Sequence, residues 1–265
     1  MNPSSVSAAP TGAGVVFDDI RRSCARAVAL IAKETDPLVT IDEAALKREL
    51  ATNADAYSEK CIPPDWAQDY HYFDGTDLTA QYILVLDALN FCFWPLPEYE
   101  YNHLASSLKR TLERDRHSFD ADRLSKVDAE ELTRWLRVHD NQEIPMAVER
   151  ARLIRELGTA LSRHFDGSAA NLIRSANGVA ADLVALVTAH FPGFRDHAVY
   201  RGEQAGLDDF VFRRMTSNLR PCVRQIFFYK RAQIFVGDVW GAFKGQGLGH
   251  FDDIATMTCF AGKEV

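Results

Sequence analysis

The sequence predicts a mostly α-helical fold, and three observations carry this prediction. Apolar residues recur every three or four positions over long segments, the spacing that places them on one face of a helix. The alternation of apolar and polar residues that is typical of strands is scarce. Residues that cap or stop helices, such as Thr76 and Pro192, stand at the ends of these segments. We therefore expect a single all-α domain.

The predicted helices follow one another along the chain. Thr76 stands in the N-cap position of one segment, and Asp128 with Glu131 resembles the capping box that begins a helix. Pro192 ends the segment before it, because proline cannot continue a helix. Only residues 225–229 hint at a strand. The segments with helical spacing are residues 19–33, 77–89, 99–114, 128–136, 146–165, 180–191 and 231–243.

The N-terminal residues, the lack of a long apolar stretch and the cysteines indicate the cellular compartment in which we expect the protein. Residues 1–15 are small and uncharged, so we expect a disordered tail rather than a signal peptide, followed by a domain over residues 16–265. No apolar stretch reaches the roughly 18 residues of a membrane span. Because no two cysteines form a CxxC pair, we expect them to be reduced and mostly buried, in the cytoplasm or the nucleus. They are Cys24, Cys61, Cys92, Cys222 and Cys259.

The charge balance limits the kind of ligand. The 265 residues carry a formal charge of −7. Proteins that hold duplex DNA or RNA depend on basic surfaces, because phosphate contacts supply most of the affinity. A small molecule is therefore the expected partner, with neither a nucleic acid polymer nor a membrane, and no metal-ligand spacing is present.

Four features could carry chemistry, and each has a structural alternative. On the residues alone we favour the alternative in every case. Residues 90–94 (NFCFW) could form a stacking wall for a planar base, or fill the core. Lys230 and Arg231 could bind a phosphate, or begin a solvated helix. Asp253 could act as an acid or base, or cap a helix. His71 could bond a ligand edge, or be structural.

Six segments, in this order, resemble the queuosine salvage proteins, also called queuosine 5'-phosphate N-glycosylase/hydrolases. The resemblance runs from about residue 15 to residue 261, and its most specific parts are NFCFWP and FYKRAQI. Chance assembly of all six is implausible. They are His71, LDALNFCFWP at 86–95, ERARLIRELG at 149–158, FPGFRD at 191–196, FYKRAQIFVGDVW at 228–240 and FDDIATMTCFA at 251–261.

The resemblance implies a fold and a reaction. The fold would be all-α and similar to helix-hairpin-helix DNA glycosylases. The reaction would be hydrolysis of the N-glycosidic bond of queuosine 5'-monophosphate to queuine and ribose 5-phosphate, without metal or organic cofactor. His71 and Phe260 would then contact the base and Lys230 the phosphate. Asp253 becomes a candidate catalytic carboxylate, with helix capping as an equal alternative.

One departure from the family concerns the end of the sequence. The family motif reads Phe-Ala-Asp-Tyr-Arg; Phe260 and Ala261 match it, but Gly262 stands where the catalytic Asp is expected. The family also continues for further helices, and residues 205–224 look like extra length. We therefore expect a C-terminally incomplete domain with little or no turnover. The alternatives are a non-catalytic queuine-binding or interaction protein and, against the charge, a nucleic-acid glycosylase.

Overall fold

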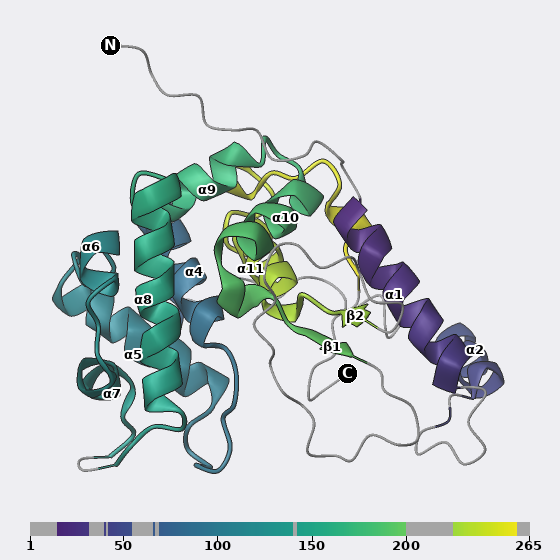
Figure 1. Ribbon diagram of the computed structural model, residues 1–265, viewed down its shortest axis with the longest axis horizontal. Helices are drawn as coiled ribbons and strands as arrows, with labels where there is room; N and C mark the ends of the chain where they lie inside the picture. The colour runs from purple at the N-terminus through teal and green to yellow at the C-terminus, as the bar shows by residue number, and fades with distance from the viewer. Residues whose placement is uncertain are drawn as a thin grey trace.

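Helices make up almost all the regular structure of this chain (Figure 1). The computed structural model describes residues 15–31, 40, 42–54, 66, 69–139, 142–199 and 225–258. The predicted all-α class is confirmed. The expected tail lies outside the described residues except for Val15, where the first helix begins, and residues 205–224 lie outside them too. In the described part, no helix is both long and apolar enough to cross a bilayer.

The observed helices follow the predicted segments closely, with ends that differ by a few residues. Helices α2, α6 and α9 were not predicted. Helices α6 and α9 have only four and seven residues, too few turns for a clear period, and α2 has no buried residue. In chain order the elements are α1 (Val15–Ile31), α2 (Glu43–Thr52), α4 (Asp77–Leu89), α5 (Tyr101–Arg114), α6 (Ala121–Leu124), α7 (Ala129–Leu136), α8 (Ala147–His164), α9 (Ala169–Ser175), α10 (Ala180–His190), β1 (His197–Val199), β2 (Gln225–Phe227) and α11 (Lys230–Ala242), with 3-10 turns at Pro192–Phe194, Gly247–Gly249 and Ile254–Thr256.

Two predicted helix caps are confirmed. The Thr76 hydroxyl accepts a hydrogen bond from the Leu78 amide at 3.2 Å, at the start of α4. The Asp128 carboxylate accepts one from the Glu131 amide at 2.7 Å, at the start of α7. Each bond satisfies an amide that has no partner within its own helix.

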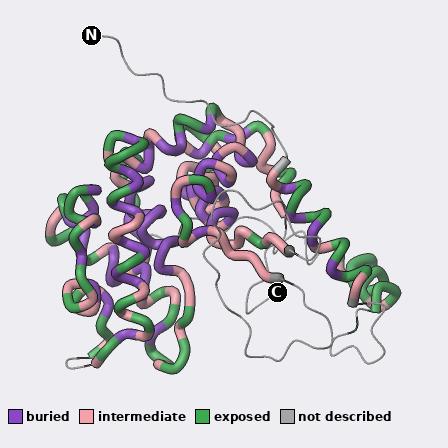
Figure 2. Tube along the Cα trace, in the orientation of Figure 1, coloured by how far each residue is buried: buried purple, intermediate pink, exposed green. Residues whose placement is uncertain are grey.

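Helix α4 forms the centre of the fold. It is buried on every side and packs against α5, α8, α9 and α11, which explains why its sequence is apolar all round. Its buried Gln81 donates to the Phe119 carbonyl at 2.8 Å and accepts from the Ala169 amide at 2.9 Å. Figure 2 shows the buried residues concentrated in the middle of the molecule, whereas α2 and the outer side of α1 are exposed.

The strand suggested at residues 225–229 exists but covers only Gln225–Phe227. Strand β2 pairs with β1 in antiparallel fashion, with Ala198 opposite Ile226. Helix α1 lies against this hairpin, and its Ser23 hydroxyl accepts from the Phe227 amide at 3.0 Å. The first helix is therefore attached to the last third of the chain (Figure 1).

Candidate functional site

Two carboxyl groups meet where α4 packs against α11. Asp87, near the end of α4, is fully buried, and neither of its carboxylate oxygens has a hydrogen-bond partner among the described residues. The carboxyl group of Asp238 on α11 is partly exposed, and its charge acts on Asp87. A buried carboxyl group without a hydrogen-bond partner is stabilised in its neutral, protonated form.

The surroundings shift the pKa of both carboxyl groups. Burial raises the pKa of Asp87 far above its ordinary value and the neighbouring Asp238 adds to this, while Asn90 and Arg231 oppose it. Burial also raises the pKa of Asp238, to about 7. Burial therefore favours the protonated form of both carboxyl groups, and most strongly that of Asp87. Such carboxyls are typical of acid–base sites.

His71 lies in a buried cluster of aromatic rings. Its Nε2 is hydrogen-bonded with the Tyr101 hydroxyl at 2.9 Å, and its ring stacks on Trp66 with centroids 3.9 Å apart. Its Nδ1 is buried and has no hydrogen-bond partner among the residues that the structure describes. Burial lowers the pKa of His71 to about 4, and the charge of Lys109 contributes. His71 is therefore neutral at physiological pH and retains one unused ring nitrogen.

The turn that follows His71 is fixed by a single carboxylate. Asp74 accepts hydrogen bonds from the hydroxyls of Tyr72, Thr76 and Thr79, at 2.9, 2.7 and 2.9 Å. Burial alone would raise the pKa of Asp74, but bonds from Thr76, Thr79 and Tyr72 together hold it well below its ordinary range. Asp74 is thus ionised and ties the histidine segment to the start of α4.

Tyr101 is hydrogen-bonded with His71 and also responds to the two carboxyl groups. Burial raises the pKa of Tyr101, and the charges of Asp238 and Asp87 raise it further. The contact between His71 and Tyr101 joins the turn at residues 70–75 to α5, and α4 packs against both α5 and α11. Sequence reasoning missed Asp87 and Asp238. The available signal was an acidic residue inside an apolar helical segment, in LVLDALNF and IFVGDVW.

The paired cations at the start of α11 have separate roles. The Lys230 amide donates to the Asp196 carboxylate at 2.8 Å, and the Lys230 ammonium has no hydrogen-bond or ion-pair partner in the described part. The Arg231 guanidinium is partly buried and donates to the carbonyls of Ala88 and Gly193. Arg231 is therefore structural, and only Lys230 remains as the phosphate candidate.

The core interpretation of residues 90–94 fits Phe93, which is half-buried and packs against the core, but it fails for Cys92 and Trp94. Cys92 is exposed, and 82% of Trp94 is exposed. The Arg150 guanidinium fixes the backbone of this loop, because it donates to the carbonyls of Phe91 and Cys92. The expectation of buried cysteines fails for Cys92. Cys24 is half-buried, both thiols are free, and the other three cysteines lie outside the described residues.

Asp253 lies at the start of another helix. Its two carboxylate oxygens accept hydrogen bonds from the amides of Ala180 and Ala181, at 2.5 and 3.1 Å. These are the first amides of α10, which has no side-chain cap of its own. The geometry favours the capping alternative for Asp253. The other two candidate positions, Phe260 and Gly262, lie outside the described residues.

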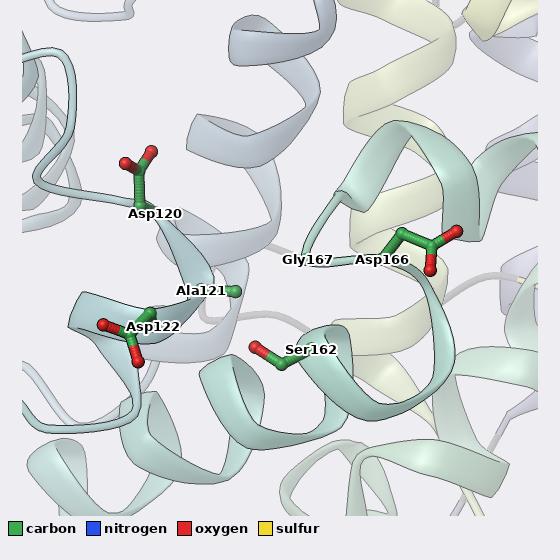
Figure 3. Close-up of a pocket in the computed structure, with 6 residues that line it drawn as sticks. All are labelled: Asp120, Ala121, Asp122, Ser162, Asp166 and Gly167. Carbon is green, nitrogen blue, oxygen red and sulfur yellow. The ribbon is translucent and has the colours of Figure 1, made fainter.

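The surface also carries a hollow between α6 and the end of α8. The carboxylates that line it point in different directions, so they do not converge on a common point (Figure 3). Within the described ranges, no three His, Cys, Asp or Glu side chains are grouped as a metal site. The lining residues are Asp120, Ala121, Asp122, Ser162, Asp166 and Gly167.

Known proteins resemble the chain over most of its length. The family model of the queuosine salvage protein matches residues 70–209 and 210–265. A queuosine 5'-phosphate N-glycosylase/hydrolase of Dictyostelium discoideum is 45% identical over 237 residues, which cover 86% of this chain and 66% of that protein. Proteins of the same name from Sphaerobacter thermophilus and Bos taurus are 38% and 31% identical, covering 82% and 71% of this chain and 63% and 53% of their own lengths. The chain thus spans between about half and two thirds of these relatives.

Proposed function

Because the chain belongs to the queuosine salvage protein family, we propose that it hydrolyses the N-glycosidic bond of queuosine 5'-phosphate and releases queuine. One observation carries this proposal. The relatives from an amoeba, a bacterium and a mammal all bear the name of this activity, and they align with 71% or more of the chain. The net charge of −7 supports a mononucleotide rather than a polymer as substrate.

The reaction sets two demands that the site can meet. Positive charge develops on the ribose as the bond to the base breaks, and a nearby carboxylate stabilises it. Queuine is a 7-deazaguanine, so it cannot be activated by protonation at N7, and tight binding of the base must assist its departure. The neutral His71 supports such binding. If Tyr101 donates to Nε2, the Nδ1–H remains to donate to an oxygen of the base.

Further contacts complete the proposal. Phe260 would stack on the base. Lys230, at the start of α11, would bind the 5'-phosphate. For Asp253 we propose the capping role rather than a catalytic one, because both of its oxygens already accept backbone amides. The free thiols of Cys24 and Cys92 support a reducing compartment such as the cytoplasm.

The reaction itself can be tested directly. The 265-residue chain is incubated with queuosine 5'-monophosphate, and free queuine is separated by chromatography. Queuine release, with no guanine release from guanosine 5'-monophosphate, would support the proposed reaction, and its rate would test the expectation of little or no turnover that Gly262 raises. Absence of queuine above the enzyme-free blank would contradict the proposal. Calorimetry with queuine then distinguishes a non-catalytic binder from a chain that does not bind the base.

The phosphate contact has its own test. Lys230→Met should raise the KM for queuosine 5'-monophosphate about tenfold or more, because a charge-assisted hydrogen bond contributes about 1.5–3 kcal/mol. The KM for queuosine without phosphate should not change. Lys126→Met is the matched control, since Lys126 forms an exposed ion pair with Asp122 near α6. An equal loss with both substrates would show that Lys230 does not bind the phosphate.

A further inference from the structure

We propose that Gln233 is a positioning residue that sets the distance between the two ends of the substrate site, an inference that rests on the function proposed above. One end is Lys230, the candidate phosphate contact. The other is the segment that leads to Phe260, the candidate base contact. The Gln233 side chain is fully buried, so it acts through the backbone that carries these residues and not by touching the substrate.

The side-chain amide of Gln233 on α11 forms three hydrogen bonds with two other parts of the chain. Its Nε2 donates to the Phe228 carbonyl at 3.0 Å. Its Oε1 accepts from the Thr258 amide at 3.0 Å and from the Thr258 hydroxyl at 2.8 Å. A buried amide with these bonds keeps one orientation, because breaking them would leave polar groups unpaired away from water. Gln233 therefore fixes the position of Thr258 relative to Phe228.

The turn that leads into α11 is held from its other side by Asp196. The amides of Phe228 and Tyr229 donate to the Asp196 carbonyl at 3.1 and 3.2 Å, and the Lys230 amide donates to the Asp196 carboxylate at 2.8 Å. Tyr229 has a left-handed backbone with φ of 47°, which residues other than glycine adopt only with support from their surroundings. Asp196 and Gln233 together supply this support, so Lys230 follows a rigid turn.

The segment that ends at Thr258 is attached to the fold at three places. The Asp253 carboxylate caps α10, and the Arg21 guanidinium of α1 donates to the Thr256 carbonyl. The third attachment is the pair of bonds from Thr258 to Gln233. Phe260 follows Thr258 by two residues, which span at most about 7 Å of extended chain, so a shift of Thr258 passes on to Phe260.

The distance between these two ends is relevant to a nucleotide, because its covalent bonds limit how far its base lies from its phosphate. A nucleotide that binds Lys230 and Phe260 together senses a change in their separation, and a misplacement of about 1 Å can cost about 10²-fold in rate. Queuine or ribose 5-phosphate alone reaches only one end and does not sense the separation. Loss of Gln233 should therefore affect the nucleotide more than either fragment.

Calorimetry with the full chain tests this difference on three ligands: queuosine 5'-monophosphate, queuine and ribose 5-phosphate. Gln233→Met keeps an unbranched side chain and removes all three bonds. It should raise the Kd of the nucleotide about tenfold or more and leave the Kd of each fragment nearly unchanged. Gln81→Met is the matched control, since buried Gln81 also bridges two segments, through the Phe119 carbonyl and the Ala169 amide. It should lower stability without changing the ratio of nucleotide to fragment affinity.

A milder pair of variants keeps the test valid if Gln233→Met does not fold. Thr258→Val has nearly the same shape but lacks the hydroxyl bond to Gln233, so it should weaken nucleotide binding about 2–10-fold. Thr258→Ser retains the hydroxyl and should bind like wild type. Equal weakening of nucleotide and fragments, or a nucleotide Kd that no variant changes, would overturn the inference and leave the proposed function standing. If the wild-type chain does not bind the nucleotide, the proposed function fails together with the inference.

Discussion

Replacing Asp253 by alanine should destabilise the fold, but it should not slow queuine release by the molecules that remain folded. The Asp253 carboxylate accepts the first two amides of α10, from Ala180 and Ala181. Alanine at a capping position costs about 0.5–2 kcal/mol, and loss of a negative charge at a helix N-terminus adds about 0.3–1 kcal/mol. We expect the free energy of unfolding to fall by about 1–3 kcal/mol.

The assay is urea unfolding followed by circular dichroism, with kcat measured well below the transition. Asp253→Asn should fall between wild type and alanine, because one side-chain oxygen remains as an acceptor while the charge is lost. Asp252→Ala is the matched control. Asp252 is exposed, and within the described residues its carboxylate is hydrogen-bonded with exposed His250 alone, so its loss should change stability by less than about 0.5 kcal/mol.

The two hypotheses for Asp253 differ in a single readout. A large fall in kcat for Asp253→Asn, with unfolding unchanged, would refute the capping account and restore Asp253 as a catalytic carboxylate. A loss of stability with kcat retained would confirm the capping role and exclude Asp253 as a catalytic carboxylate.

Two further predictions concern packing and pH. Gly158→Ala on α8 should lower stability by about 1–3 kcal/mol, because the added carbon would lie 2.4 Å from the Ser125 amide nitrogen and 2.5 Å from the Ala121 carbonyl oxygen of α6. Gly241→Ala on α11 is the control, since the space around it is open, and it should be neutral or stabilising by up to about 1 kcal/mol. Equal effects of the two substitutions in urea unfolding would contradict this prediction. The pKa of His71 is about 4 in the folded chain against an ordinary value of about 6.5, so the unfolded chain binds the proton first as pH falls. Between these pH values the free energy of unfolding of wild type should fall by up to about 3 kcal/mol relative to that of His71→Gln. Parallel curves of stability against pH for the two proteins would refute this prediction.

Local patterns in the sequence determined the helical class and most of the helices. The apolar period of residues 180–191 and Pro192 gave α10 almost to the residue, and Thr76 and Asp128 gave the caps of α4 and α7. These features depend on neighbours within one or two turns, so they can be recognised without the fold. The family followed from segments such as NFCFWP and FYKRAQI, whose order along the chain is likewise a property of sequence.

Tertiary packing alone decided what the polar groups do. Asp87 and Asp238 lie far apart in the chain, and only the contact between α4 and α11 makes them a pair. Arg231 is occupied by carbonyls of two other segments, and Asp253 caps a helix that precedes it by many residues. The protonation state and the free hydrogen-bonding capacity of a side chain depend on burial and on partners, which are set by elements distant in sequence. The sequence by itself therefore determined most of the helices and the family, whereas the tertiary structure decided the partners and the burial of the polar side chains.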